Sequence, residues 1–197
     1  AEEGVKGDIY INGIKRNIHS PSDAIRYGIG LVPEERKSQG FIKVFNNSEN
    51  ITLTDISRYV QHALVNDRKK NISSQEYIDK LNVNPRNPNK YTSTLSGGNQ
   101  QKVVIAKWLH RDSSILILDE PTKGIDVGAK EEIYNLLEEL ASKGKTIIIV
   151  SSELPEIVGL CDTVMVMSEG QQKALLKGDQ INEREILKYA LGGEIHE

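Results

Sequence analysis

Cysteine is almost absent from this 197-residue chain, and so are long apolar runs. Cys161 is the only cysteine, so no internal disulfide can form, and we expect a reducing compartment with this thiol buried in the fold. The longest apolar runs, such as ILIL at 115–118, are far too short to span a bilayer. The first residues, AEEGVKGD, contain no apolar stretch of the kind found in a signal peptide.

An excess of charge of one sign is also missing. The 25 basic and 28 acidic residues leave a net charge of −3, so the general electrostatic basis for nucleic-acid binding is lacking and we expect no nucleic-acid partner. Hydrophobic residues make up 38% and charged residues 27%, which is typical of a soluble globular protein long enough to bury a core.

A third absence is the phosphate-binding pattern G-x-x-x-x-G-K-[ST], which occurs nowhere in the sequence. Without it there is neither a lysine for the β- and γ-phosphates of a nucleotide nor a hydroxyl for Mg²⁺.

The segment LSGGNQQK at 95–102 nevertheless has the features of an anion site. Val104, Ile105, Trp108 and Leu109 fall on one helical face, which places the two glycines at the start of a helix. Unpaired N–H groups and the helix dipole favour an anion there. The alternative is a serine-capped helix preceded by a flexible turn.

The order of expected elements indicates an α/β fold around a mainly parallel sheet. We expect 46–109 to be a helical subdomain inserted into the core formed by 1–45 and 110–197. DRKK at 67–70 is expected to be an exposed loop, and SSQE at 73–76 matches a helix-starting capping box. The remaining expected elements are a hairpin at 7–18 with Asn12-Gly13 at its turn, helices at 20–28, near 48–58, before Gly144, at 154–161 and at 182–193, and strands at 29–32, 114–119, 146–152 and 163–170.

A second candidate site follows the apolar strand in ILILDEPT at 115–122. In open α/β sheets, ligands bind at the carboxyl ends of the strands, where Asp119 and Glu120 are expected. The first acid can hold Mg²⁺ and the second can polarise an attacking water. The alternative is a pair of solvated loop acids.

The segments LSGGNQQK, ILILDE at 115–120 and KGID at 123–126, in this order, resemble the signature motif, Walker B and D-loop of the ATP-binding cassette (ABC) ATPases. LVPEERKSQG at 31–40 and VSSELPEIVGLCDTVMVM at 150–167 sharpen the resemblance. The chain is similar to the second, C-terminal cassette of the ATPase subunits of bacterial monosaccharide importers of the ribose and galactose type.

The resemblance implies a site shared between two cassettes, each ATP lying between the Walker A loop of one and the signature loop of the other. It implies that Asp119 binds Mg²⁺ and that Glu120 is catalytic. The residues implied to contact nucleotide are Ser96, Gly97, Gly98, Gln100, Asp126 and Ser152.

Three departures from the family pattern weaken the implied site. The Walker A loop is absent, because 7–18 resembles the strand pair that follows that loop. Glu34 replaces the Q-loop glutamine, and Ser152 replaces the switch histidine, although Ser152 can alternatively cap the helix near Leu154. Glu35 and Arg36 lie where the family contacts its membrane partner, and a plain surface turn is the equal alternative.

We therefore expect part of an ABC-type ATPase subunit that uses ATP and Mg²⁺ to energise monosaccharide import, bound peripherally at the cytoplasmic face of the inner membrane. The implied partners are a second cassette, transmembrane permease subunits and, indirectly, a sugar-binding protein. A non-catalytic half that only clamps nucleotide is one alternative. A DNA-repair-type ABC ATPase is the other, and it is disfavoured because 46–92 contains no coiled-coil heptads.

A first prediction concerns turnover by the 197 residues alone. Because they lack the P-loop lysine and hydroxyl, we expect no ATP hydrolysis above background in a phosphate-release assay. Steady hydrolysis by a homogeneous preparation that disappears in its Glu120→Gln variant would contradict the prediction.

Overall fold

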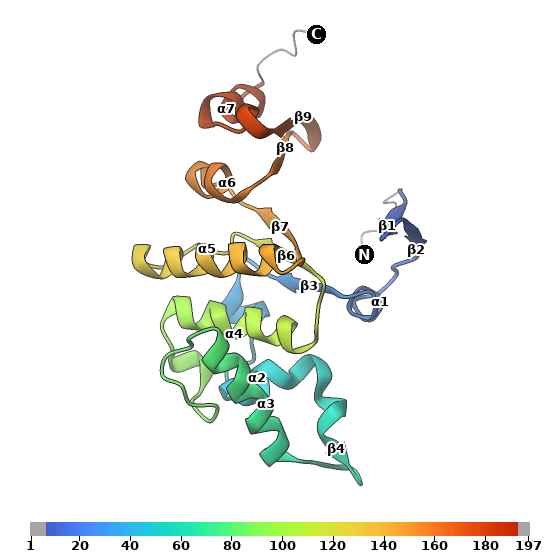
Figure 1. The fold of residues 1–197 in the computed structure, drawn as a ribbon, viewed down its shortest axis with the longest axis vertical. Helices are drawn as coiled ribbons and strands as arrows, with labels where there is room; N and C mark the ends of the chain where they lie inside the picture. The colour runs from blue at the N-terminus through green and yellow to red at the C-terminus, as the bar shows by residue number, and fades with distance from the viewer. Residues whose placement is uncertain (1–6, 193–197) are drawn as a thin grey trace. The chain divides into compact units, whose positions relative to one another are not determined.

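The computed structural model describes residues 7–192 and divides the chain into two compact units, Ala1–Ile148 and Ile149–Glu197 (Figure 1). The elements before the division are β1 (Ile9–Ile11), β2 (Ile14–Arg16), α1 (Pro21–Arg26), β3 (Ile29–Val32), a π-helical turn (Arg36–Gly40), α2 (Asn47–Thr52), a 3₁₀ segment (Leu53–Tyr59), β4 (Val60–Gln61), β5 (Leu64–Val65), α3 (Asp67–Lys80), a 3₁₀ turn (Thr92–Thr94), α4 (Gly97–His110), β6 (Ile115–Asp119) and α5 (Val127–Ser142). The division falls within β7 (Thr146–Val150), and α6 (Leu154–Leu160), β8 (Thr163–Ser168), β9 (Gln171–Lys177), a 3₁₀ turn (Gly178–Gln180) and α7 (Glu183–Ala190) follow.

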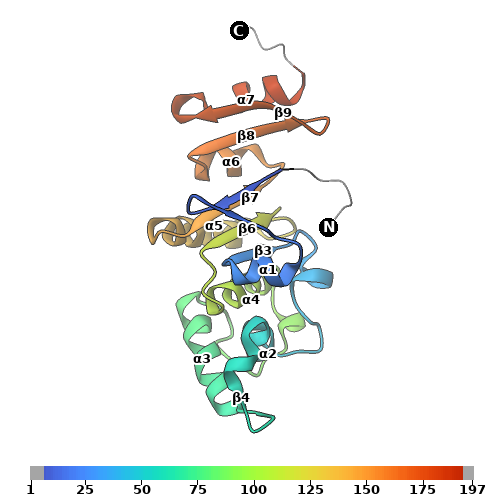
Figure 2. The ribbon, with the colours of Figure 1, turned by 90° about the vertical axis from the view of Figure 1, so that its right-hand side faces the viewer.

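Strands β3, β6 and β7 form a sheet in that order (Figure 2). β3 runs parallel to β6, with Ile29 opposite Ile115 and Val32 opposite Leu118. Val32 and Leu118 are fully buried, as expected of an apolar strand inside an α/β core. The predicted α/β class with a parallel sheet is confirmed.

The contact between α4 and β3 is close because one glycine leaves room for the only tryptophan. A Cβ on Gly30 would lie 2.8 Å from the Trp108 ring. The Trp108 indole N–H donates to the Leu31 carbonyl at 2.7 Å. Helix α4 therefore lies directly on the strand that leads to the 34–40 segment.

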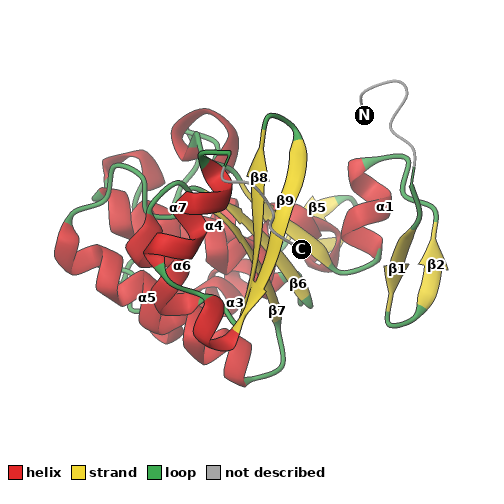
Figure 3. Cartoon of the chain, turned by 90° about the horizontal axis from the view of Figure 1, so that it is seen from above, coloured by secondary structure: helices red, strands yellow, loops and turns green. Residues whose placement is uncertain are grey.

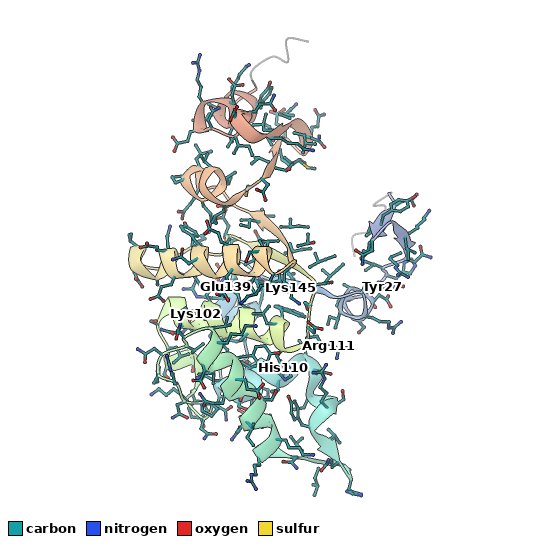
Figure 4. The ribbon with its side chains drawn as sticks, in the orientation of Figure 1. Tyr27, Lys102, His110, Arg111, Glu139 and Lys145 are labelled. Carbon is teal, nitrogen blue, oxygen red and sulfur yellow. The ribbon has the colours of Figure 1, made fainter. Side chains whose placement is uncertain are left out.

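The remaining strands form antiparallel pairs, of which β1–β2 and β8–β9 are clear in Figure 3. Asn12 and Gly13 have φ values of 53° and 73°, as the predicted hairpin turn requires. The predicted helix after it is confirmed as α1, whose N-cap Ser20 accepts from the Asp23 N–H. The Arg16 guanidinium lies 5.0 Å from the centre of the Tyr27 ring, and Figure 4 labels Tyr27 beside α1.

The start of α3 corrects two predictions. The helix begins at Asp67, so DRKK at 67–70 is its first turn and not a loop, and SSQE at 73–76 lies inside the helix. The N-cap is Asn66, whose side chain accepts from the Lys69 N–H at 3.0 Å. The Lys70 ammonium, 7% exposed, pairs with Asp67 at 2.7 Å one turn earlier.

Helices α2, α3 and α4 pack against one another. They account for most of the regular structure in the predicted helical subdomain at 46–109, but the division of the chain into compact units falls elsewhere. The predicted domain boundaries therefore stay a prediction. No helix within the described residues is long and apolar enough to cross a bilayer.

The second unit has its own small core. Val164, Val166, Leu176 and Ile186 are buried together, with α6 and α7 against the β8–β9 pair. The sequence predicted the β8 segment but not β9, which pairs antiparallel with it. Cys161 is half-buried and not fully buried as predicted, and burial raises the pKa of its thiol.

The position of the α3 N-cap can be tested by measuring stability. Asn66→Ala should lower the free energy of unfolding by about 1 kcal/mol, because it removes the cap bond to Lys69. Ser73→Ala is the matched control, expected within about 0.5 kcal/mol of the wild type because an interior serine caps nothing. Denaturant unfolding measures both, and a larger loss from Ser73→Ala than from Asn66→Ala would reinstate the sequence prediction.

Candidate nucleotide-facing site

The start of α4 has the geometry predicted for the LSGG segment. Ser96 is the N-cap, in an extended conformation, and the first helical bond runs from the Gln100 N–H to the Ser96 carbonyl at 2.9 Å. The Ser96 side chain makes no capping bond to the first-turn N–H groups. Ser96 is also exposed, so the helix start presents a hydroxyl and a positive dipole end to its surroundings.

Gly97 and Gly98 are required for space. A Cβ on Gly97 would lie 2.8 Å from Nη2 of Arg36 and 3.2 Å from the Gly124 carbonyl oxygen. A Cβ on Gly98 would lie 2.7 Å from the Cβ of Ala129 in α5. The two glycines therefore bring the start of α4 directly against the segment that follows β6.

Asp119 and Glu120 stand at the end of β6, as predicted. Asp119 is the last residue of the strand, and Glu120 has φ of 45°, a left-handed conformation uncommon for a residue other than glycine. Such conformations cost roughly 1–3 kcal/mol and cluster at functional sites. The turn continues through Gly124 to Asp126, which caps α5 by accepting from the Ala129 N–H at 3.0 Å.

Arg36 joins three segments that lie far apart in the sequence. Its Nη1 donates to the Lys123 carbonyl at 2.7 Å and its Nη2 to the Gly124 carbonyl at 3.1 Å, while the same guanidinium lies against Gly97. Burial lowers the pKa of Arg36 below its usual value, and the neighbouring Glu35 opposes that shift. Sequence reasoning missed this bridge, although docking to a membrane partner remains a prediction for Glu35 and Arg36.

Glu34 contacts the same loop through an ion pair with the Lys123 ammonium. Hydrogen bonding and charge from Glu34 raise the pKa of Lys123. The Lys123 side chain is exposed and the Glu34 side chain is partly exposed, so the pair adds little to stability. The ion pair instead orients the Glu34 carboxylate, which occupies the Q-loop position, toward the loop after β6.

The other end of the 36–40 turn is fastened to α4 itself. The Lys107 ammonium, 7% exposed, donates to the Gly40 carbonyl at 2.7 Å and lies 5.0 Å from the centre of the Trp108 ring. Burial lowers the pKa of Lys107 to about 8. The turn that carries Arg36 is thus held at both ends.

Gln100 differs from the other predicted nucleotide contacts. Its side chain is 3% exposed and donates to the Leu95 carbonyl at 3.0 Å, so it braces the loop from inside and is not presented to a ligand. The half-exposed residue is Asn99, one position earlier. Consecutive helical residues point about 100° apart, which explains the difference.

Ser152 belongs to the second unit and is exposed. The alternative prediction that it caps the next helix is wrong, because the N-cap of α6 is Glu153, whose N–H donates to the Ser151 hydroxyl at 3.0 Å.

The Mg²⁺ role of Asp119 stays a prediction. Within residues 7–192 no cluster of three His, Cys, Asp or Glu side chains is placed to hold a metal ion. A Mg²⁺ ion bound by Asp119 would take its other ligands from a nucleotide, water or another segment.

The family model described as ABC transporter matches residues 1–123, more than half of the sequence. The chain belongs to the ABC transporter family.

The curated relatives are bacterial import proteins. The "Ribose import ATP-binding protein RbsA" of Halalkalibacterium halodurans is 47% identical over 96% of this chain, and that of Geobacillus kaustophilus is 44% identical over 95%. This chain spans 38% of the length of each of them.

Solved structures support the fold. A nucleotide-free ATP-binding cassette from an ABC transporter matches with a TM-score of 0.77 at 20% identity, over 98% of this chain and 78% of that one. The ATP-binding cassette MJ0796, in a dimeric post-hydrolysis state with ADP and Pi, matches with a TM-score of 0.69 at 23% identity, over 87% and 73%.

The contact between Gly98 and α5 can be tested by stability. Gly98→Ala should lower the free energy of unfolding by about 1–3 kcal/mol, because the new methyl group overlaps Ala129. Gly128→Ala is the matched control: the nearest atom to its new Cβ is 3.8 Å away, so a neutral or stabilising effect is expected. Equal effects of the two substitutions on urea unfolding would contradict the close contact.

Proposed function

We propose that this chain is the signature-bearing part of an ATP-binding subunit that energises monosaccharide import into a bacterium. The observation that carries the proposal is the start of α4. An exposed Ser96 hydroxyl, uncommitted to capping, stands at the N-terminus of a buried helix whose position is fixed by the close contacts of Gly97 and Gly98. This arrangement suits an anionic group such as a phosphate.

The chain's own groups fill only one side of such a site. Ser96 and the first-turn N–H groups would bind and orient the γ-phosphate of an ATP whose other phosphates are held by a second cassette. Asp119 would bind Mg²⁺, and Glu120 would orient a water at a phosphate held by its own cassette. The predicted contacts of Asp126 and Ser152 belong to the same proposal.

The partners follow from this division of the site. A second ABC cassette is needed to complete it. Transmembrane permease subunits would receive the movement of the two cassettes during ATP turnover, with a sugar-binding protein acting indirectly. We place the assembly at the cytoplasmic face of the inner membrane, with the chain bound peripherally. The printed names of the relatives, which are ribose import proteins, support a monosaccharide as the cargo.

The proposal is tested in the assembled transporter. Ser96→Arg should abolish ATP turnover at the site served by this loop, because a long cation fills the place of the phosphate, and it should leave the fold intact. Ser93→Arg makes the same change at an exposed position three residues earlier and should leave turnover near the wild-type rate. Turnover and transport that survive Ser96→Arg would overturn the proposal.

A further inference from the structure

The side chain of Asn99 connects the first turn of α4 to the loop that precedes it. Its Nδ2 donates to the Ser96 hydroxyl oxygen at 2.9 Å. Its Oδ1 accepts from the backbone N–H of Asn84 at 2.6 Å. One amide group thus links the predicted phosphate-facing serine to Asn84, which lies fifteen positions before Asn99.

The Asn84 N–H decides which way the Asn99 amide points. A backbone N–H can only donate, so the atom facing it must be the amide oxygen. The NH₂ group must then face Ser96. The direction of the second bond follows from the first, and it makes the Ser96 oxygen an acceptor.

The Asn84 segment is itself held in place by α4 and α5. The Lys102 ammonium donates to the Asn82 carbonyl at 3.2 Å and pairs with Glu132 of α5 at 2.7 Å. Figure 4 labels Lys102 on α4. These contacts hold the chain at Asn82, two residues before Asn84.

This arrangement leaves the Ser96 proton free. At an ordinary N-cap the serine oxygen accepts from a first-turn backbone N–H, which uses a donor that an anion would need. Here the Asn99 amide donates to the Ser96 oxygen instead of a backbone N–H, and Ser96 makes no capping bond. The hydroxyl proton and the first-turn N–H groups can then all point to one anion.

We infer that Asn99 is a positioning residue that holds Ser96 as a hydrogen-bond donor toward the phosphate group at the start of α4. The inference rests on the proposed function of that site. It assigns to Asn99 a role through Ser96, without contact to the nucleotide.

The test measures kcat and KM for ATP in the assembled transporter. The single variants are Asn99→Ala, Asn99→Asp and Ser96→Ala. The double variants combine each Asn99 change with Ser96→Ala. Asn99→Ala should lower kcat about three- to tenfold, the effect of one lost hydrogen bond. Asn99→Asp keeps the acceptor for Asn84 but captures the Ser96 proton, so its loss should at least equal that of Ser96→Ala. Asn89→Ala, an exposed asparagine of the same loop, is the matched control and should leave kcat unchanged.

The double variants decide the mechanism. If Asn99 acts through Ser96, neither Asn99 change lowers kcat further once Ser96 is alanine. Additive losses, or a wild-type kcat in Asn99→Asp, would overturn the inference and leave Asn99 as a loop anchor. A wild-type kcat in Ser96→Ala would instead overturn the proposed function, so the two failures are distinguishable.

Discussion

The burial of α4 on every side is the constraint on which the first unit depends. Nearly all of the helix from Gly98 to His110 is buried, because β3, α2, α3, α5 and the 36–40 turn all pack against it. A helix enclosed in this way can neither rotate nor slide without breaking contacts in several directions. The position of the Ser96 backbone at its start is therefore set by the core of the unit.

Polar groups inside this helix make its packing specific. The Lys107 ammonium donates to the Gly40 carbonyl, the Lys102 ammonium pairs with Glu132, and His110 Nε2 lies 2.6 Å from the Tyr59 hydroxyl. A buried polar group without a partner costs free energy, so each of these contacts favours one placement of α4 over its near neighbours. Burial also lowers the pKa of His110, which favours the neutral imidazole.

Sequence patterns predicted the elements whose apolar residues are regularly spaced, and failed where polar residues obscure that spacing. The β6 strand was predicted because it is a continuous apolar run, and the helix before Gly144, which is α5, because its apolar residues recur at helical spacing. The start of α3 was wrong because its first turn is almost entirely charged, and Ser73 offered a more familiar cap than Asn66. In the site, the placement of Ser96, Asp119 and Glu120 at element ends was predicted correctly. The Arg36 bridge and the inward turn of Gln100 depend on tertiary contacts and helical rotation, which no local pattern records.

The buried Trp108 also serves as an intrinsic fluorescence probe of the first unit. It is the only tryptophan of the chain, 8% exposed, with its indole N–H bonded to the Leu31 carbonyl and the Lys107 ammonium near its ring. Its emission is therefore expected to respond to changes in the contact between α4 and the strand that leads to Glu34 and Arg36. Movement of that strand relative to the helix can be followed by intrinsic fluorescence, without an attached dye.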